Sequence, residues 1–277
     1  MRTAMTTVTF VHLTDLHVSH PDLRDEQLNA DTVGALDAII ERVNGIEPPP
    51  SFVAISGDLT NRGDVASYRL LRQKLEALEI PLVYALGNHD TRPGFYQGML
   101  DRTDDGEAPY FHDTVIDGVH VVVLDTSVPG RIGGALCDAQ FEFLEAALRR
   151  HPELPKIVVM HHAPSVGDDA GYAWERLDAA DTARFLTLVK DRNVAGILTG
   201  HIHYDRVSVW HGIPVIVSNG NHSAVDPTYT NGLRIMAGTS FGFCALRPSG
   251  LTVSFVPMPS DRRELRRAPD ERIRTYV

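Results

Sequence analysis

The chain has 277 residues, enough for a substantial core, and its apolar and charged fractions are those of an ordinary globular protein. No apolar run reaches the ~18 residues of a membrane span, no signal peptide is evident, and two cysteines do not suggest a disulfide framework, so we expect a cytoplasmic protein without a membrane partner. The formal net charge of −10 disfavours a nucleic-acid polymer as partner, because such binding needs many Lys and Arg contacts to phosphate.

The first third of the chain predicts strands that alternate with helices. Runs of β-branched and apolar residues predict the strands, and apolar residues at helical spacing predict amphipathic helices. Strands are expected at residues 7–13, 51–56 and 82–86, and helices at 31–43 and 64–78. This order implies parallel strands with helical crossovers.

The rest of the chain mixes both types and then becomes mostly β. A hairpin is predicted to turn at Asp117-Gly118. Helices are expected at 138–149 and 178–190, and strands at 156–160, 194–199, 206–210, 213–217, 241–246 and 251–256. We interpret residues 1–277 as one α/β domain with two packed sheets, in which residues 205–260 complete the second sheet and the pocket. The basic segment 261–277 is interpreted as a solvated tail or a helix.

Polar residues of the kinds that bind metals follow five of the predicted strands. In an open α/β sheet, ligands bind at the carboxyl ends of the strands, so these side chains should meet at one edge. The candidates are Asp15, His17, Asp58, Asn88, His89, Asp90, His161, His162, His201 and His203.

The spacing and chemistry of these residues favour a centre with two metal ions. Asp15/His17 and His201/His203 are i,i+2 pairs, which point to the same face of an extended backbone. Imidazole and carboxylate suit Zn, Fe and Mn. The ligands are too many for one tetrahedral ion, whereas two ions that share a bridging carboxylate would use them all.

The complete motif set resembles the calcineurin-like metallophosphoesterase superfamily. The motifs are Asp-x-His at 15–17, Gly-Asp at 57–58, Gly-Asn-His-Asp at 87–90, His161, and Gly-His-x-His at 200–203. The resemblance implies a four-layer αββα sandwich of two mixed sheets, and a phosphodiesterase with two metal ions per chain. It assigns Asp15, His17, Asp58 and His203 to the first metal, and Asp58, Asn88, His161 and His201 to the second.

The resemblance also implies a mechanism. A hydroxide that bridges the metals would attack phosphorus, and the metals would neutralise the phosphoryl oxygens. Asn88 would be a neutral oxygen ligand, and it would also contact the substrate. His89 would donate to the phosphate or the leaving oxygen, Asp90 would orient His89, and His162 is expected to pack or to support its neighbour.

The substrate expected from the resemblance is a small phosphodiester. The motifs look closest to bacterial class III cyclic-nucleotide phosphodiesterases and their glycerophosphodiesterase relatives. We therefore expect 3′,5′-cyclic nucleotides such as cAMP, with glycerophosphodiesters as the alternative. His222 and Thr126 are expected to contact the substrate, and loops 18–31 and 165–178 are expected to shape specificity.

Other functions fit the sequence less well. A protein phosphatase usually carries Gly-Asn-His-Glu where this chain has Asp90, and a nuclease would want a basic groove. A metal-free scaffold would have no need of so many buried ligands. A homodimer or a larger homo-oligomer stays open.

Overall fold

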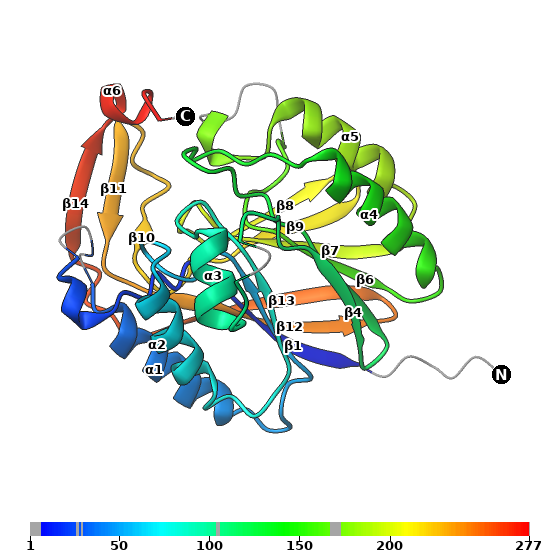
Figure 1. Cartoon of the computed structure of the whole chain (residues 1–277), viewed down its shortest axis with the longest axis horizontal. Coiled ribbons are helices and arrows are strands. Elements are labelled where there is room, and N and C mark those ends of the chain that lie inside the picture. Colours follow the sequence, from blue (N-terminus) through cyan, green and yellow to red (C-terminus); the bar gives the residue numbers. More distant parts are fainter. Residues whose placement is uncertain (1–6, 26–27, 29, 104–105, 167–172, 277) are drawn as a thin grey trace.

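The computed structural model describes residues 7–25, 28, 30–103, 106–166 and 173–276. Figure 1 shows two large sheets that lie against each other, with helices on their outer sides and a small sheet at one end. Among the described residues, no helix is long and apolar enough to cross a membrane.

A five-stranded sheet carries the N-terminal strands. Its order is β13-β12-β1-β2-β3, and β1, β2 and β3 run parallel, as the sequence predicts. The strand β12 pairs antiparallel with β1 and thereby joins the end of the chain to its beginning. The bounds are Val8–Leu13 for β1, Val53–Ser56 for β2, Leu82–Ala85 for β3, Ser240–Arg247 for β12 and Gly250–Pro257 for β13.

A six-stranded sheet carries the middle of the chain in the order β4-β5-β6-β7-β9-β8. The hairpin β4–β5 turns at Asp117 and Gly118, which both have positive φ, as the sequence predicts for a tight turn. The bounds are His112–Ile116 for β4, Val119–Val123 for β5, Lys156–Val159 for β6, Val194–Thr199 for β7, Arg206–Trp210 for β8 and Ile213–Val217 for β9.

The two sheets bury an apolar layer between them, and helices cover their outer faces. Phe10 and Phe52 of the first sheet stack at 4.6 Å between ring centroids, in the same buried cluster as Val121 and Val159 of the second. The helices α1, α2 and α3 pack on the five-stranded sheet, and α4 and α5 on the six-stranded sheet. The bounds are Thr32–Asn44 for α1, Val65–Leu75 for α2, Arg92–Met99 for α3, Asp138–Arg150 for α4 and Ala179–Val189 for α5. The expected αββα sandwich is confirmed.

A third sheet, which the sequence does not predict, comes from the C-terminal part of the chain. Its strands are β10 (Ala224–Val225), β11 (Gly232–Met236) and β14 (Glu264–Pro269), followed by the short helix α6 (Asp270–Ile273). The interpretation of 261–277 as a solvated tail or helix is therefore wrong for β14.

One further expectation needs correction. Residues 205–260 do not complete only the second sheet: β8 and β9 join it, whereas β12 and β13 extend the first. The segment after Asp90 leads directly into α3, since Thr91 caps the helix and Pro93 suits its first turn. A single domain over residues 1–277 stays a prediction.

Candidate metal centre

The structure brings the predicted ligands together where the two large sheets meet. Loops after β1, β2 and β3 of one sheet and after β6 and β7 of the other supply them. Ligand atoms of four overlapping groups lie within 4.8 Å of one another: His17-His203-His222, His161-His162-His201, His17-Asp58-His89 and Asp15-Asp58-His161.

Hydrogen bonds fix which ring nitrogen carries a proton in each of the four candidate ligand histidines. In each ring one nitrogen lies near a carbonyl or amide oxygen, which accepts a hydrogen bond and so requires N–H at that nitrogen. The pairs are His17 Nδ1 with Asn61 Oδ1 at 2.9 Å, His161 Nδ1 with the Ser56 carbonyl at 2.8 Å, His201 Nε2 with the Trp174 carbonyl at 2.8 Å and His203 Nδ1 with the Ser223 carbonyl at 3.2 Å. The other nitrogen of each ring is then free to bind a metal.

Several buried polar atoms at the centre lack a hydrogen-bond partner of good geometry among the described residues, and they fit a metal. These atoms are Nε2 of His17, Nε2 of His161 and Oδ1 of Asn88. Buried polar atoms are normally satisfied, so their convergence is typical of a site that takes a cation. The donor set of imidazole, carboxylate and amide oxygens suits Zn, Fe or Mn.

Two fully buried carboxylates lie among these rings. Asp58 Oδ2 is 3.3 Å from His161 Nε2 and 3.5 Å from His17 Nε2, and Asp15 Oδ1 is 3.3 Å from His203 Nε2. Burial alone would raise the pKa of Asp58, but His161 and His89 hold it well below its usual value. Against burial, Asp58 raises the pKa of His161 to about 9, so without metal this ring carries a proton that a cation would displace.

The ligand loops are not extended, contrary to our expectation for the i,i+2 pairs. Left-handed φ values occur at all four paired residues and at Asp58: Asp15 50°, His17 44°, Asp58 49°, His201 76° and His203 51°. The intervening Leu16 and Ile202 are buried. The pairs therefore converge through tight turns, and non-glycine residues in this region mark stored backbone strain, which clusters at functional sites.

Glycines let the loops approach one another. A Cβ on Gly57 would come within 2.6 Å of His161 Nδ1, and one on Gly87 would overlap the Asp58 carboxylate. A Cβ on Gly200 would overlap the Thr14 hydroxyl and the Asp15 carboxylate. A larger residue at any of these three positions would therefore push the loops of the centre apart.

Gly200→Ala should therefore displace Asp15 and destabilise the protein by about 1–3 kcal/mol, the usual cost of overpacking. Elemental analysis should also find less bound metal. Gly106→Ala is the matched control, because nothing lies within 4 Å of the added Cβ. Equal metal content and melting temperature in the two variants would contradict this account of Gly200.

His89 is held by Asn61 and not by Asp90. The His89 Nδ1 donates to the Asn61 carbonyl at 2.9 Å, and its backbone N–H donates to Asp58 Oδ1 at 2.9 Å. Asp90 instead accepts from the backbone N–H groups of Leu59, Thr60 and Gly87 and from the Tyr68 hydroxyl. The expectation that Asp90 orients the His89 ring is therefore wrong: Asp90 ties together the loops that follow β2 and β3.

The expected role of Thr126 also needs correction. It is fully buried, and its hydroxyl lies 2.8 Å from His162 Nδ1, while His162 Nε2 donates to the Ile132 carbonyl at 2.8 Å. Thr126 does not line the cavity over the centre. The expected substrate contact from Thr126 is wrong, and His162, with both ring nitrogens bonded, has the supporting position expected for it.

His222 lies at the centre, as the sequence-based interpretation requires. Its ring centroid is 4.7 Å from that of His17, and its buried Nε2 has no partner among the described residues. Burial, with His17 and His203 nearby, lowers the pKa of His222 to about 2, so the ring is neutral. Substrate contact by His222 stays a prediction.

A cavity of about 730 Å³ opens above the ligands. One wall belongs to the small third sheet and α6, through Leu233, Ile235, Arg266, Arg272 and Tyr276. The opposite wall includes Trp174 and Glu175 of the loop expected to shape specificity. Residues 26–27 and 29 of the other such loop, and 167–172 of this one, lie outside the described residues.

Sequence reasoning missed Asn61 and Trp174. Asn61 supports both His17 and His89, and it stands in the Gly-Asp-Leu-Thr-Asn stretch that carries Asp58. Trp174 accepts the His201 hydrogen bond through its carbonyl, and its ring centroid is 5.6 Å from that of Tyr276. A backbone contact leaves no trace in residue identity, so no signal marked Trp174.

The calcineurin-like phosphoesterase family model matches residues 8–205, which include every candidate ligand. A cAMP/cGMP dual specificity phosphodiesterase of Mycobacterium tuberculosis is 32% identical over 84% of this chain and 71% of its own length. The chain belongs to the calcineurin-like phosphoesterase family. Calcineurin-like phosphoesterases are dimetal enzymes, in agreement with the convergent His and Asp groups.

Other proteins that resemble this chain agree with this assignment. A 3′,5′-cyclic adenosine monophosphate phosphodiesterase of Escherichia coli is 27% identical over 74% of this chain and 73% of its own. A glycerophosphodiester phosphodiesterase of Enterobacter lignolyticus is 29% identical over 68% and 69%. A dimetal phosphatase from Danio rerio shares the fold, with a TM-score of 0.66, 15% identity and coverage of 92% and 99%. The expectation of a metal-dependent phosphodiesterase is confirmed.

Proposed function

We propose that the chain hydrolyses small phosphodiesters, with 3′,5′-cyclic nucleotides such as cAMP as the first candidates. The convergence of histidine ring nitrogens on the buried carboxylates of Asp15 and Asp58 carries the proposal, because it fits two cations and a bound phosphate. The choice of cyclic nucleotides as substrate is supported by the likeness to a cAMP/cGMP phosphodiesterase. Glycerophosphodiesters are the second candidate, on the likeness to a glycerophosphodiester phosphodiesterase.

Two ions of Mn, Fe or Zn would be held as the resemblance implies. Asp15, His17, Asp58 and His203 would hold the first, and Asp58, Asn88, His161 and His201 the second. Bound ions would supply positive charge for the phosphoryl oxygens and would acidify a water molecule. The close approach of Asp58 to both His17 and His161 supports its place between the two sets.

In catalysis, the protein's own side chains would orient the histidines of the centre and donate a hydrogen bond to the substrate. With Nδ1 of His89 donating to the Asn61 carbonyl, only Nε2 of this ring is available to a substrate. We propose that this nitrogen donates to the leaving oxygen or to the phosphate. Asn61 would keep His89 and His17 in fixed orientations, and His222, whose ring also lies beside that of His17, would contact the substrate.

We expect diesters to be preferred over monoesters. A dianionic monoester gains most from a bidentate arginine beside the metals, but the two arginines of this cavity, Arg266 and Arg272, belong to the C-terminal wall and not to the ligand loops. Bis(p-nitrophenyl) phosphate and cAMP should be cleaved by protein reconstituted separately with Mn, Zn and Fe. A higher kcat/KM for p-nitrophenyl phosphate with every metal would contradict the preference.

The cytoplasmic location and a homo-oligomeric state stay predictions. Fractionation and light scattering would test them.

A further inference from the structure

A second cavity adjoins the one above the metal centre. It has a volume of about 660 Å³ and shares Glu175, Tyr204, Val225 and Leu233 with its neighbour. Tyr204 directly follows the candidate ligand His203 in the chain. A ligand whose phosphate lies at the metal centre could therefore extend past Tyr204 into this outer cavity.

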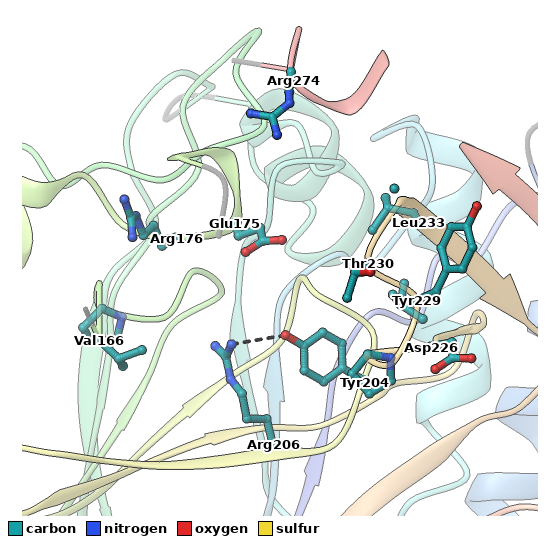
Figure 2. Close-up of a pocket in the computed structure, with 14 residues that line it drawn as sticks. Val166, Glu175, Arg176, Tyr204, Arg206, Asp226, Tyr229, Thr230, Leu233 and Arg274 are labelled. Carbon is teal, nitrogen blue, oxygen red and sulfur yellow. Dashed lines mark hydrogen bonds between the residues drawn. The ribbon is translucent and has the colours of Figure 1, made fainter. Parts of the chain in front are cut away.

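The outer cavity is basic, although the chain as a whole has a net charge of −10. Arg176, Arg206 and Arg274 line it from three separate segments, and Figure 2 shows their side chains around the same space. Two acidic residues also line the cavity. One of them, Asp226, is ion-paired with Arg234, and one of the arginines, Arg274, is ion-paired with Asp270. The lining therefore has three arginines against the two acidic residues Glu175 and Asp226.

Arg206 is held in place but has an unused donor. Its Nη1 donates to the Tyr204 hydroxyl at 3.2 Å, and its guanidinium carbon is 5.6 Å from the centroid of the Tyr204 ring. Its Nε is buried and has no hydrogen-bond partner among the described residues. A buried donor of this kind is normally satisfied, and an anionic oxygen would satisfy it best.

We propose that the outer cavity binds a second anionic group, a phosphate or a carboxylate, of a substrate whose scissile diester lies at the metal centre. This inference rests on the proposed phosphodiesterase function and extends it to a substrate class: diesters with a further negative charge on one of their alcohols. A cyclic mononucleotide has no such group and would leave the outer cavity unused. Linear diesters that end in a phosphate should use both cavities.

A matched pair of substrates tests the inference. The dinucleotide ApA and its 5′-phosphorylated form pApA contain the same internal diester and differ only in the terminal phosphate. For the metal-loaded wild-type protein, kcat/KM for cleavage of the internal diester should be about tenfold higher for pApA, the worth of a charge-assisted hydrogen bond. Arg206→Gln should bring this ratio towards one, and Arg206→Lys should keep part of it.

Two further variants separate recognition from general effects. Arg274→Gln, on another segment of the cavity, should also lower the ratio. Arg69→Gln on the exposed face of α2 removes the same charge and should leave the ratio at its wild-type value. A wild-type ratio near one would overturn the inference, as would equal losses for ApA and pApA in Arg206→Gln, which would mean that Arg206 only supports Tyr204.

Cleavage of bis(p-nitrophenyl) phosphate distinguishes failure of the anion site from failure of the proposed phosphodiesterase function. If the metal-loaded protein cleaves it but treats ApA and pApA alike, only the anion site is refuted. If no metal gives cleavage of any diester, the proposed function fails, and the inference that rests on it fails too.

Discussion

Replacing Asp58 with alanine should lower the metal content at both sites, and not at one site alone. The Asp58 carboxylate lies between His17 and His161, which belong to the two proposed ligand sets, so each ion would lose a ligand. Phosphodiesterase activity should fall below about 1% of wild type, because the positive charge at the phosphate would be lost. Elemental analysis should find less than about one metal per chain, where the wild type should hold about two.

Thermal unfolding gives a second measurement of the same effect. Added Mn²⁺ or Zn²⁺ should raise the melting temperature of the wild type, since a ligand that binds the folded state stabilises it, and should do so far less for Asp58→Ala. Asp138→Ala is the control, because that side chain is 83% exposed on α4. Two full metal equivalents in Asp58→Ala would refute a shared carboxylate.

The His89→Ala variant should keep its metals but lose roughly 10²–10⁴-fold in rate, the usual contribution of a positioned acid. The His89 ring is anchored by the Asn61 carbonyl and lies 4.6 Å from the His17 ring between centroids, beside the ligands and not among the assigned ones. If His89 protonates the leaving oxygen, the loss should be smaller for bis(p-nitrophenyl) phosphate than for cAMP. A p-nitrophenolate leaves with little protonation, whereas a ribose alkoxide does not.

The pattern of losses decides between roles for His89. An equal deficit for both substrates would mean that His89 acts on the phosphoryl oxygens. Loss of metal would mean that His89 is itself a ligand. Its ligand atom lies within 4.8 Å of those of His17 and Asp58, so the metal content of the variant tests this directly. His211→Asn is the control, because His211 is exposed in a left-handed turn that asparagine tolerates.

The sequence predicts well which side chains meet at the candidate centre, because each of them follows a buried strand. The carboxyl ends of β1, β2 and β3 meet at one edge of a parallel sheet, so neighbours in space can be inferred from similar positions along the chain. The parts that fail depend on details that residue identity does not carry. Asp90 bonds to backbone N–H groups, and the turns at Asp15 and His17 are left-handed, which no spacing rule reveals.

The C-terminal wall was missed for a different reason. The strand β14 is one edge of a small sheet, and it shows little alternation because only Ala268 is fully buried in it. Pattern-based prediction needs a buried face, and a short strand that lies over a cavity has almost none. Tyr276 and Arg272 therefore look like a solvated end in the sequence although they border the site.

The antiparallel pairing of β1 with β12 has a consequence for biosynthesis. The strand β1 (Val8–Leu13) has neighbours on both sides in the finished sheet, and one of them, Ser240–Arg247, is made more than 200 residues later. Until that later segment is made, one edge of a mostly apolar strand stays open to other nascent chains. Chaperone binding during that interval should therefore raise the yield of native protein.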